Sequence, residues 1–266
     1  MTGGTWHLVD LGETKYSYNF RVVGEEGDYY LIERIFDGEV VQKLKLLKLA
    51  PHIKLFIGLM STPGAGKSSV AAILGSLGVN FATSHKRVSD ALKDLGVDEY
   101  DERDALQGLG SYLGANYPVV WINQLIKGFN EQEKEVVIWD GMRFPHDVIL
   151  SRIAAGGKYS TDDSGKYAFL KENGRFEAIL VDADEKIRSE RSKTRARPGD
   201  PTGLADFYRQ DFNDRRVFLF DITRGMASIH IENSGTSSEL LAKVNYVWQE
   251  LCKTYGIQTG IVQTKL

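Results

Sequence analysis

Cysteine is nearly absent from this chain, since Cys252 is the single cysteine in 266 residues. An internal disulfide is therefore excluded, and a reducing compartment is expected. No apolar run approaches the ~20 residues that a helix needs to cross a bilayer. The first residues, MTGGTWHLVDLGE, contain no basic segment followed by an apolar core. We therefore expect no signal peptide and no membrane partner, and we expect a cytoplasmic protein (in the host cytoplasm if it is viral).

An excess of charge of one sign is also missing. The 33 Lys and Arg residues nearly balance the 36 Asp and Glu residues, and the formal net charge is −3. No global basic field would attract nucleic acid, so nucleic acid is not an expected partner. The composition, with 42% hydrophobic and 26% charged residues, is ordinary for a globular protein. The length suffices for one large domain, alone or with a small addition.

Residues 1–50 differ from the rest of the chain. They contain short runs rich in β-branched and aromatic residues, separated by the turn signals GE, GEEGD and DG. This pattern predicts a small antiparallel β subdomain that ends near Pro51. No cluster of reactive side chains stands out in it. We therefore favour a lid, an interface or a stabilising addition over a dedicated binding site.

From residue 51 to residue 266 the rhythm changes to one of alternating strands and helices. The strand-like runs cover residues 54–60, 136–140, 176–182 and 228–233. Such alternation predicts an α/β domain with a parallel sheet flanked by helices. The polar, glycine-rich residues 156–175 are expected to form a hairpin or loop insertion.

The stretch STPGAGKSS at residues 61–69 lies between a predicted strand and a predicted helix, which is the P-loop arrangement. Small residues allow backbone N–H groups to converge on phosphate oxygens, and the following helix adds its positive N-terminal end. Lys67 would reach the β- and γ-phosphates of ATP or GTP, and Ser68 would ligate Mg²⁺. The predicted nucleotide-binding residues of this loop are Pro63, Gly64, Ala65, Gly66, Lys67, Ser68 and Ser69.

One position of the loop departs from the usual pattern G-x-x-x-x-G-K-[ST]. Ser61 stands where the first glycine is usual. Serine is small, but it tolerates a positive φ less well than glycine does. We expect the turn to survive this replacement.

A carboxylate and an arginine follow the predicted strand at residues 136–140. Asp140 ends that strand, at the edge of the sheet where open α/β folds bind ligands. There it can hold Mg²⁺ or accept a hydrogen bond from a phosphoryl acceptor. Arg143 could bind a second phosphate with its planar fork. The alternative for Arg143 is a surface salt bridge with Asp147.

A basic segment follows at residues 185–201. Arg188, Arg191 and Arg195 fall at spacings of three and four residues, on one face of a predicted helix. Such a run is often only a solvated surface. Phosphoryl transfer, however, needs cations around the transferring group, and a mobile arginine-rich lid supplies them. We favour a lid at about residues 185–217.

Several of these segments resemble the deoxynucleoside monophosphate kinases of the type found in bacteriophages, which are P-loop kinases related to adenylate kinase and dephospho-coenzyme A kinase. Besides the P-loop, the likeness is carried by RDALQGLGSYLGANYPVVWINQLI (103–126), DGMRFPHDVILSRIAAGG (140–157) and IENSGTSSELLAKV (231–244). It spans roughly residues 53–255. The departures are Ser61, an additional residue between Asp140 and Arg143, and the whole of residues 1–50.

The resemblance implies a P-loop kinase fold with an arginine-rich lid, using ATP and Mg²⁺. Lys67 and Ser68 would bind ATP and the metal ion. Asp140 would assist the metal ion or the acceptor phosphate, and Arg143 would bind that phosphate.

The resemblance also implies roles for the lid and for the turn near residue 233. Arg188 and Arg191 would close over the transferring group, with Arg195 and Arg197 behind them. For adenine, the predicted contacts are Asn233 and Gly235.

The acceptor side is less defined by the sequence. Lys86 or Arg87 could meet the monophosphate, or could simply begin an exposed helix. Arg103 and Gln107 lie one helical turn apart and could recognise phosphate or base, although Gln107 could instead be a buried, satisfied amide. His85 and His146 have no partner at metal-ligand spacing, and we expect both to be structural.

The function predicted from the sequence is ATP-dependent phosphoryl transfer to a nucleoside monophosphate, with a deoxynucleotide favoured, giving the diphosphate and ADP. Catalysis would be positioning and charge neutralisation. The alternatives are a kinase of another small acceptor, such as dephospho-coenzyme A, and an ATPase switch or assembly module in which residues 1–50 bind a protein. A homodimer is left open.

Overall fold

The centre of the molecule is a five-stranded parallel sheet. The computed structural model describes residues 10–11, 14–15, 19–77, 79–82, 112, 114, 116–161, 168–195, 200–201 and 203–258. The strands of the sheet are β6 (Leu55–Ser61), β7 (Asn80–Ala82), β8 (Val136–Met142), β11 (Phe176–Asp182) and β12 (Ile229–Glu232). Their order is β12-β11-β6-β8-β7, and all neighbours run parallel.

The central strands are apolar because both of their faces are buried. On β6, Leu55, Ile57 and Leu59 belong to one hydrophobic core, while Phe56 and Met60 belong to the other. This alternation follows from the two-residue period of a strand. The seven-residue strand β6 therefore contributes side chains to both hydrophobic cores.

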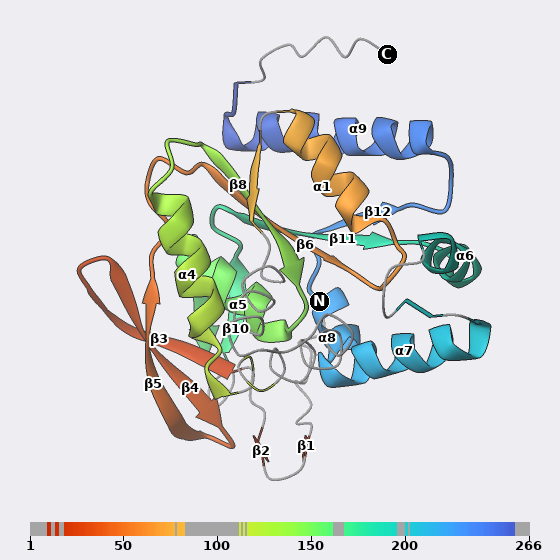
Figure 1. Ribbon diagram of the computed structural model, residues 1–266. Coiled ribbons are helices and arrows are strands. Elements are labelled where there is room, and N and C mark those ends of the chain that lie inside the picture. Colours follow the sequence, from red (N-terminus) through yellow and green to blue (C-terminus); the bar gives the residue numbers. More distant parts are fainter. Residues whose placement is uncertain are drawn as a thin grey trace, which may run out of the picture.

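Helices cover both faces of the sheet (Figure 1). One core contains α1 (Lys67–Ser76) and α9 (Ser237–Tyr255). The other contains α4 (Val119–Asn130), α5 (Pro145–Ala154) and α8 (Phe220–Arg224). Helix α9 begins with a capping box between Thr236 and Glu239, which satisfies backbone N–H groups at its first turn. The predicted α/β class with helices flanking a parallel sheet is confirmed.

The N-terminal region forms the antiparallel sheet that its sequence predicts. Strands β3 (Asn19–Glu26), β4 (Tyr29–Phe36) and β5 (Glu39–Leu47) pair in that order. A short pair, β1 (Asp10–Leu11) and β2 (Thr14–Lys15), precedes them. Phe20, Ile32 and Leu46 are buried in the same core as α4 and α5. The sheet therefore shares its core with the rest of the chain, and the proposed domain boundary at residue 50 stays a prediction.

Two asparagines of α4 attach this sheet to the rest of the molecule. Asn123 accepts a hydrogen bond from the Leu47 N–H and donates one to the Lys45 carbonyl, each at 2.8 Å. Asn130, seven residues and two turns further on, does the same for the Ala50 N–H and the Lys48 carbonyl. Strand β5 is an edge of its sheet, so these amides satisfy backbone groups that would otherwise lack partners.

The remaining elements form an insertion and a helical pair. Strands β9 (Lys158–Thr161) and β10 (Ala168–Glu172) are antiparallel, as the prediction of a hairpin at residues 156–175 requires. Helices α6 (Glu185–Arg195) and α7 (Leu204–Val217) lie side by side at one end of the sheet (Figure 1). Among the helices described, none is long and apolar enough to cross a membrane.

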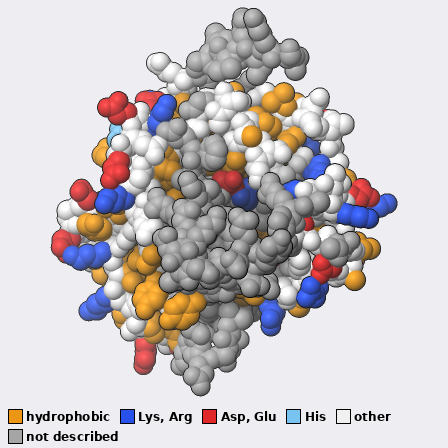
Figure 2. Space-filling view, viewed as in Figure 1, with side chains coloured by type: hydrophobic (Ala, Val, Ile, Leu, Met, Phe, Trp, Pro, Cys, Tyr) orange, Lys and Arg blue, Asp and Glu red, His pale blue; other side chains and the backbone are white. Residues whose placement is uncertain are grey.

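Hydrophobic side chains remain exposed on the N-terminal sheet. Val23 and Val41 are about half exposed, at 50% and 49%. Figure 2 shows hydrophobic side chains gathered over this part of the molecule.

Candidate functional site

The predicted phosphate loop lies at the carboxyl end of the central strand β6 and leads into α1. Gly64 and Gly66 have φ angles of +81° and +95°, in the region that glycine adopts without strain. Within the described part of the chain, the N–H groups of Gly64 and Gly66 donate to no hydrogen-bond acceptor. Free backbone donors beside a helix N-terminus are the elements of an anion site.

Ser61, the departure from the usual loop pattern, causes no backbone strain. It is the last residue of β6 and pairs with Val181 of β11. Among the described residues, the non-glycine residues with positive φ are Asp37 and Leu219, so Ser61 is not one of them. The expectation that the turn survives this replacement is confirmed.

Lys67 and Asp140 lie in direct contact. The Lys67 ammonium donates to a carboxylate oxygen of Asp140, and the two side chains are 23% and 14% exposed. Burial lowers the pKa of Lys67, the neighbouring carboxylate opposes that change, and the nearby Arg143 adds to it. The predicted lysine and the predicted metal or acceptor carboxylate are thus brought together from β8 and the start of α1.

Arg143 follows β8 and is held in place through its backbone. Its N–H donates to Asp147 Oδ2 at 2.9 Å, and its carbonyl accepts from Thr223 Oγ1 at 2.9 Å. The guanidinium lies over the Phe218 ring, 4.8 Å from the centroid. No ion pair joins this guanidinium to another described residue, and the alternative of a salt bridge with the Asp147 carboxylate does not occur. Arg143 is an exposed cation on a fixed support beside the Lys67–Asp140 pair.

His146 and Asp147 are buried at the start of α5. Asp147 accepts hydrogen bonds from the N–H groups of Arg143 and Phe144, and burial raises its pKa to about 7. Burial, together with the positive charge of Arg34, lowers the pKa of His146 to about 3. The His146 ring stacks on Phe144, with centroids 4.7 Å apart. The expected structural role of His146 agrees with this position inside the core.

The side chain of Arg188, on α6, is buried. It donates to both carboxylate oxygens of Asp211 on α7, with Nη1–Oδ1 at 2.6 Å. The same Nη1 donates to the Pro63 carbonyl at 3.2 Å. The Phe207 ring packs against this guanidinium. Arg188 therefore joins α6, α7 and the phosphate loop, and its predicted contact with the transferring group stays a prediction.

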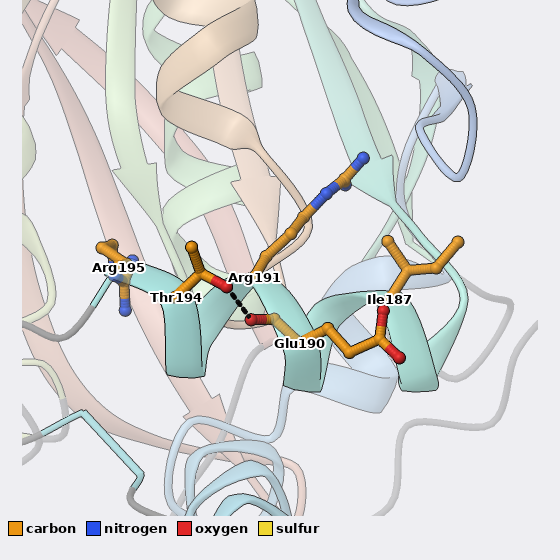
Figure 3. Close-up of a pocket in the computed structure, with 5 residues that line it drawn as sticks. All are labelled: Ile187, Glu190, Arg191, Thr194 and Arg195. Carbon is orange, nitrogen blue, oxygen red and sulfur yellow. Dashed lines mark hydrogen bonds between the residues drawn. The ribbon is translucent and has the colours of Figure 1, made fainter.

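Arg191 and Arg195 line an open groove of about 540 Å³ along α6. Figure 3 shows Arg191 extending away from the helix, while Glu190 runs along it toward Ile187. Arg191 Nη1 donates to the Asn233 carbonyl at 2.8 Å. Arg195 instead forms an ion pair with Asp200. The three arginines predicted to share one face thus have three different environments.

Asn233 and Gly235 form the turn after β12. The Arg191 guanidinium reaches the Gly235 carbonyl at 3.5 Å. Asn233 is 5% exposed, and its Nδ2 donates to the Ala65 carbonyl at 2.8 Å. This turn therefore contacts the phosphate loop directly.

Six of the residues singled out in the sequence lie outside the described residues, namely His85, Lys86, Arg87, Arg103, Gln107 and Arg197. Pro63, Ala65, Ser68 and Ser69 occupy the predicted loop and the first turn of α1. Ser68 is exposed at that turn.

The sequence reasoning missed Asp182 and Arg224. Asp182 ends β11 and accepts from Arg224 Nη2 at 2.9 Å. The signal was available, because the position of Asp182 at the end of an apolar strand is the same one that singled out Asp140. Asp211 carries no local signal, because its partner Arg188 belongs to another helix.

The fold is similar to several solved structures. TT1252 from Thermus thermophilus is 19% identical over 74% of this chain and 97% of its own, with a TM-score of 0.45. Shikimate kinase from Acinetobacter baumannii in complex with shikimate is 14% identical over 75% and 94%, also with a TM-score of 0.45. A gluconokinase from Sinorhizobium meliloti 1021 is 14% identical over 78% and 99%, with a TM-score of 0.39. A comparison with curated proteins found no match.

A family comparison places the loop and strands in context. The AAA domain family matches residues 57–206, from within β6 to the first turn of α7. This segment is more than half of the chain and includes the phosphate loop, the Lys67–Asp140 contact and the whole of α6. The chain therefore belongs to the AAA domain family.

Proposed function

We propose that this protein transfers a phosphoryl group from ATP to a nucleoside monophosphate, with a deoxynucleotide as the favoured acceptor. The observation that carries the proposal is the arrangement at the ends of β6 and β8. Three features lie together: a glycine loop with N–H groups that have no acceptor in the described part of the chain, Lys67 paired with Asp140, and the exposed Arg143. The first two features fit a nucleoside triphosphate, and the third supplies a cation for a second phosphate.

The chemistry needs little beyond these groups. An oxygen of the acceptor phosphate attacks the γ-phosphorus, and the bond from that phosphorus to the bridging oxygen of ADP breaks. The attacking oxygen is already anionic, so no strong general base is required. Lys67 would neutralise charge on the β- and γ-phosphates, and Arg143 would orient the acceptor.

The residues present also fit Mg²⁺. The ion prefers oxygen ligands. Ser68, which follows Lys67 in the sequence, could supply its hydroxyl, and Asp140, which contacts Lys67, could supply its carboxylate. The bound ion would supply charge neutralisation at the phosphates. The carboxylate could be released to this task when the ammonium group of Lys67 turns to the nucleotide.

The groove along α6 is our proposed place for the nucleoside of ATP. It lies next to the loop, because a Cβ added to Gly66 would stand 4.0 Å from Arg191 Nη1. Ile187 offers an apolar surface and Arg191 a planar cation, and both kinds of group pack against a base.

The proposal is tested by ADP production from ATP and Mg²⁺ with a panel of ribo- and deoxyribonucleoside monophosphates. Dephospho-coenzyme A, shikimate and gluconate complete the panel. We expect turnover that requires a monophosphate and is lost in Lys67→Ala. Lys253→Ala removes an exposed lysine in the last turn of α9 and should leave turnover unchanged.

Two results would contradict the proposal. Turnover that is slow and equal with and without every acceptor favours an ATPase switch or assembly module. Turnover that requires dephospho-coenzyme A or one of the non-nucleotide acceptors retains the kinase and replaces its substrate class.

A further inference from the structure

We infer that Asn233 is a positioning residue of the phosphate loop, rather than a contact to the adenine base. The inference rests on the proposed nucleotide site but not on the identity of the acceptor. It begins from the side-chain amide of Asn233, which lies in the interior next to the loop.

Asn233 forms three hydrogen bonds to three different parts of the chain, two through its backbone and one through its side chain. Its backbone N–H donates to the Asp182 carbonyl at the end of β11, at 2.7 Å. Its backbone carbonyl accepts a hydrogen bond from Arg191 of α6. Its side chain donates to the Ala65 carbonyl at 2.8 Å. Backbone and side chain are thus both engaged, and the group has little freedom to turn toward a ligand.

The bond to Ala65 fixes the direction of the next N–H group. A peptide unit is planar and trans, so its C=O and N–H point in opposite directions. The Ala65 carbonyl and the Gly66 N–H belong to one such unit. When Asn233 holds the carbonyl outward, the Gly66 N–H points inward, toward the place of a phosphate.

Arg188 orients a second peptide unit of the loop in the same way. It donates to the Pro63 carbonyl at 3.2 Å, and that carbonyl shares a peptide unit with the Gly64 N–H. Gly64 and Gly66 are the two glycines of the loop with positive φ. Two buried side chains therefore orient two peptide units whose N–H groups have no acceptor among the described residues.

The space around Gly66 confirms how closely Asn233 fits the loop. A Cβ added to Gly66 would stand 2.2 Å from Asn233 Nδ2, so a side chain at residue 66 would require the Asn233 amide to move. Glycine at this position therefore serves the approach of the amide as well as the positive φ. A preset anion site loses less entropy when it binds, so we expect Asn233 to raise affinity for the phosphates.

The test compares ATP with a ligand that has phosphates and no base. Binding of Mg²⁺-ATP and of Mg²⁺-tripolyphosphate is measured by calorimetry for the wild type and for Asn233→Asp. The aspartate has nearly the same shape but places an acceptor against the Ala65 carbonyl. We expect both affinities to fall by the same factor, roughly tenfold. Gln249→Glu makes the same chemical change on an exposed part of α9 and should alter neither affinity.

Each other result overturns the inference. A loss of affinity for ATP alone makes Asn233 a base contact, and unchanged affinity for both ligands gives it no role in the loop. If the wild type binds neither ligand, the proposed function fails as well, which separates the two failures.

A second variant and a second measurement cover misfolding of Asn233→Asp. Asn233→Ala removes the donor without adding a repulsive acceptor, and the same equal loss is expected. In the wild type, the NMR shift of the Asn233 side-chain amide should respond equally to ATP and tripolyphosphate. A response to ATP alone would overturn the inference without any substitution.

Discussion

Lys67 donates a hydrogen bond to Asp140, and this contact joins the phosphate loop to the end of the adjacent strand β8. The pair places a cation and an anion where a nucleotide and a metal ion would each need one of them. In the structure each side chain neutralises the charge of the other. The contact also sets the protonation of Lys67, because the carboxylate works against the effect of burial.

Replacing Asp140 by Asn should shift the pH dependence of ATP binding. The carboxylate raises the pKa of Lys67, so its removal lowers that pKa further. ATP binding requires the ammonium form, which is lost as pH rises through the pKa. The alkaline loss of ATP affinity should therefore begin at lower pH in Asp140→Asn than in the wild type, as measured between about pH 7 and about pH 10. Identical profiles would show that Lys67 does not govern binding.

Arg143→Lys should weaken binding of the acceptor and leave binding of ATP unchanged. Lysine keeps the charge but loses the planar fork and much of the packing on Phe218. We expect the KM for the monophosphate to rise roughly tenfold, with the Kd for ATP unchanged. Arg143→Ala should give a larger rise. Equal losses for both substrates would place Arg143 on the ATP side of the site.

Asp211→Ala should destabilise the protein strongly, because it leaves the Arg188 guanidinium buried without its partner. The cost of breaking a buried pair is about 3–5 kcal/mol, measured as the free energy of unfolding in urea. Arg188→Met combined with Asp211→Leu should recover most of that loss. The double variant should still bind Mg²⁺-tripolyphosphate more weakly than the wild type, because the Pro63 carbonyl lacks its donor. Full stability with full affinity would remove Arg188 from the loop's support.

Residue pattern alone predicted the loop, the parallel sheet and the N-terminal strands, because each depends on local spacing and burial. The loop follows from the glycines before Lys67, and the sheet follows from apolar strands such as residues 136–140. The environments of the three arginines of α6 could not be predicted in this way. Their spacing places them on one face of α6, but their long side chains end at Asp211, Asn233 and Asp200.

The same limit applies to Asn233. The resemblance of its turn to an adenine-binding segment indicates a ligand contact. The sequence shows only which residues are neighbours along the chain, so it gives no sign of the partner that the Asn233 side chain has in the folded protein. Its hydrogen-bond partner, Ala65, is 168 residues away. A side chain whose function is to hold a distant carbonyl leaves no local pattern.

His146 and Asp147 predict opposite pH effects on stability. His146 has a pKa of about 3 in the folded protein, lowered from its usual value, so stability rises with pH until the unfolded histidine is deprotonated near pH ~6.5. Asp147 has a pKa of about 7, raised from its usual value, so its contribution is present at low pH and is lost as pH rises to about 7. Between about pH 4 and about pH 6.5 the two slopes should nearly cancel.

Asp147→Asn separates these two effects. With the carboxyl group removed, the gain in stability with rising pH that His146 causes remains. The free energy of unfolding of the variant, relative to that of the wild type, should therefore increase as pH rises through that range. Urea unfolding at several pH values measures the difference. A difference that is constant with pH would mean that Asp147 titrates normally.

The amides of α4 offer a test of how firmly the N-terminal sheet is held. Asn123→Ala removes the acceptor of the Leu47 N–H and the donor to the Lys45 carbonyl. Leaving such groups without partners costs about 1–3 kcal/mol. Hydrogen exchange at the Leu47 amide should therefore accelerate in Asn123→Ala, while the Ala50 amide, which Asn130 holds, should change less. Equal acceleration of both amides would mean that β5 detaches from α4 as one unit, and unchanged exchange at Leu47 would show that packing of residues such as Leu46 holds the strand without the amide.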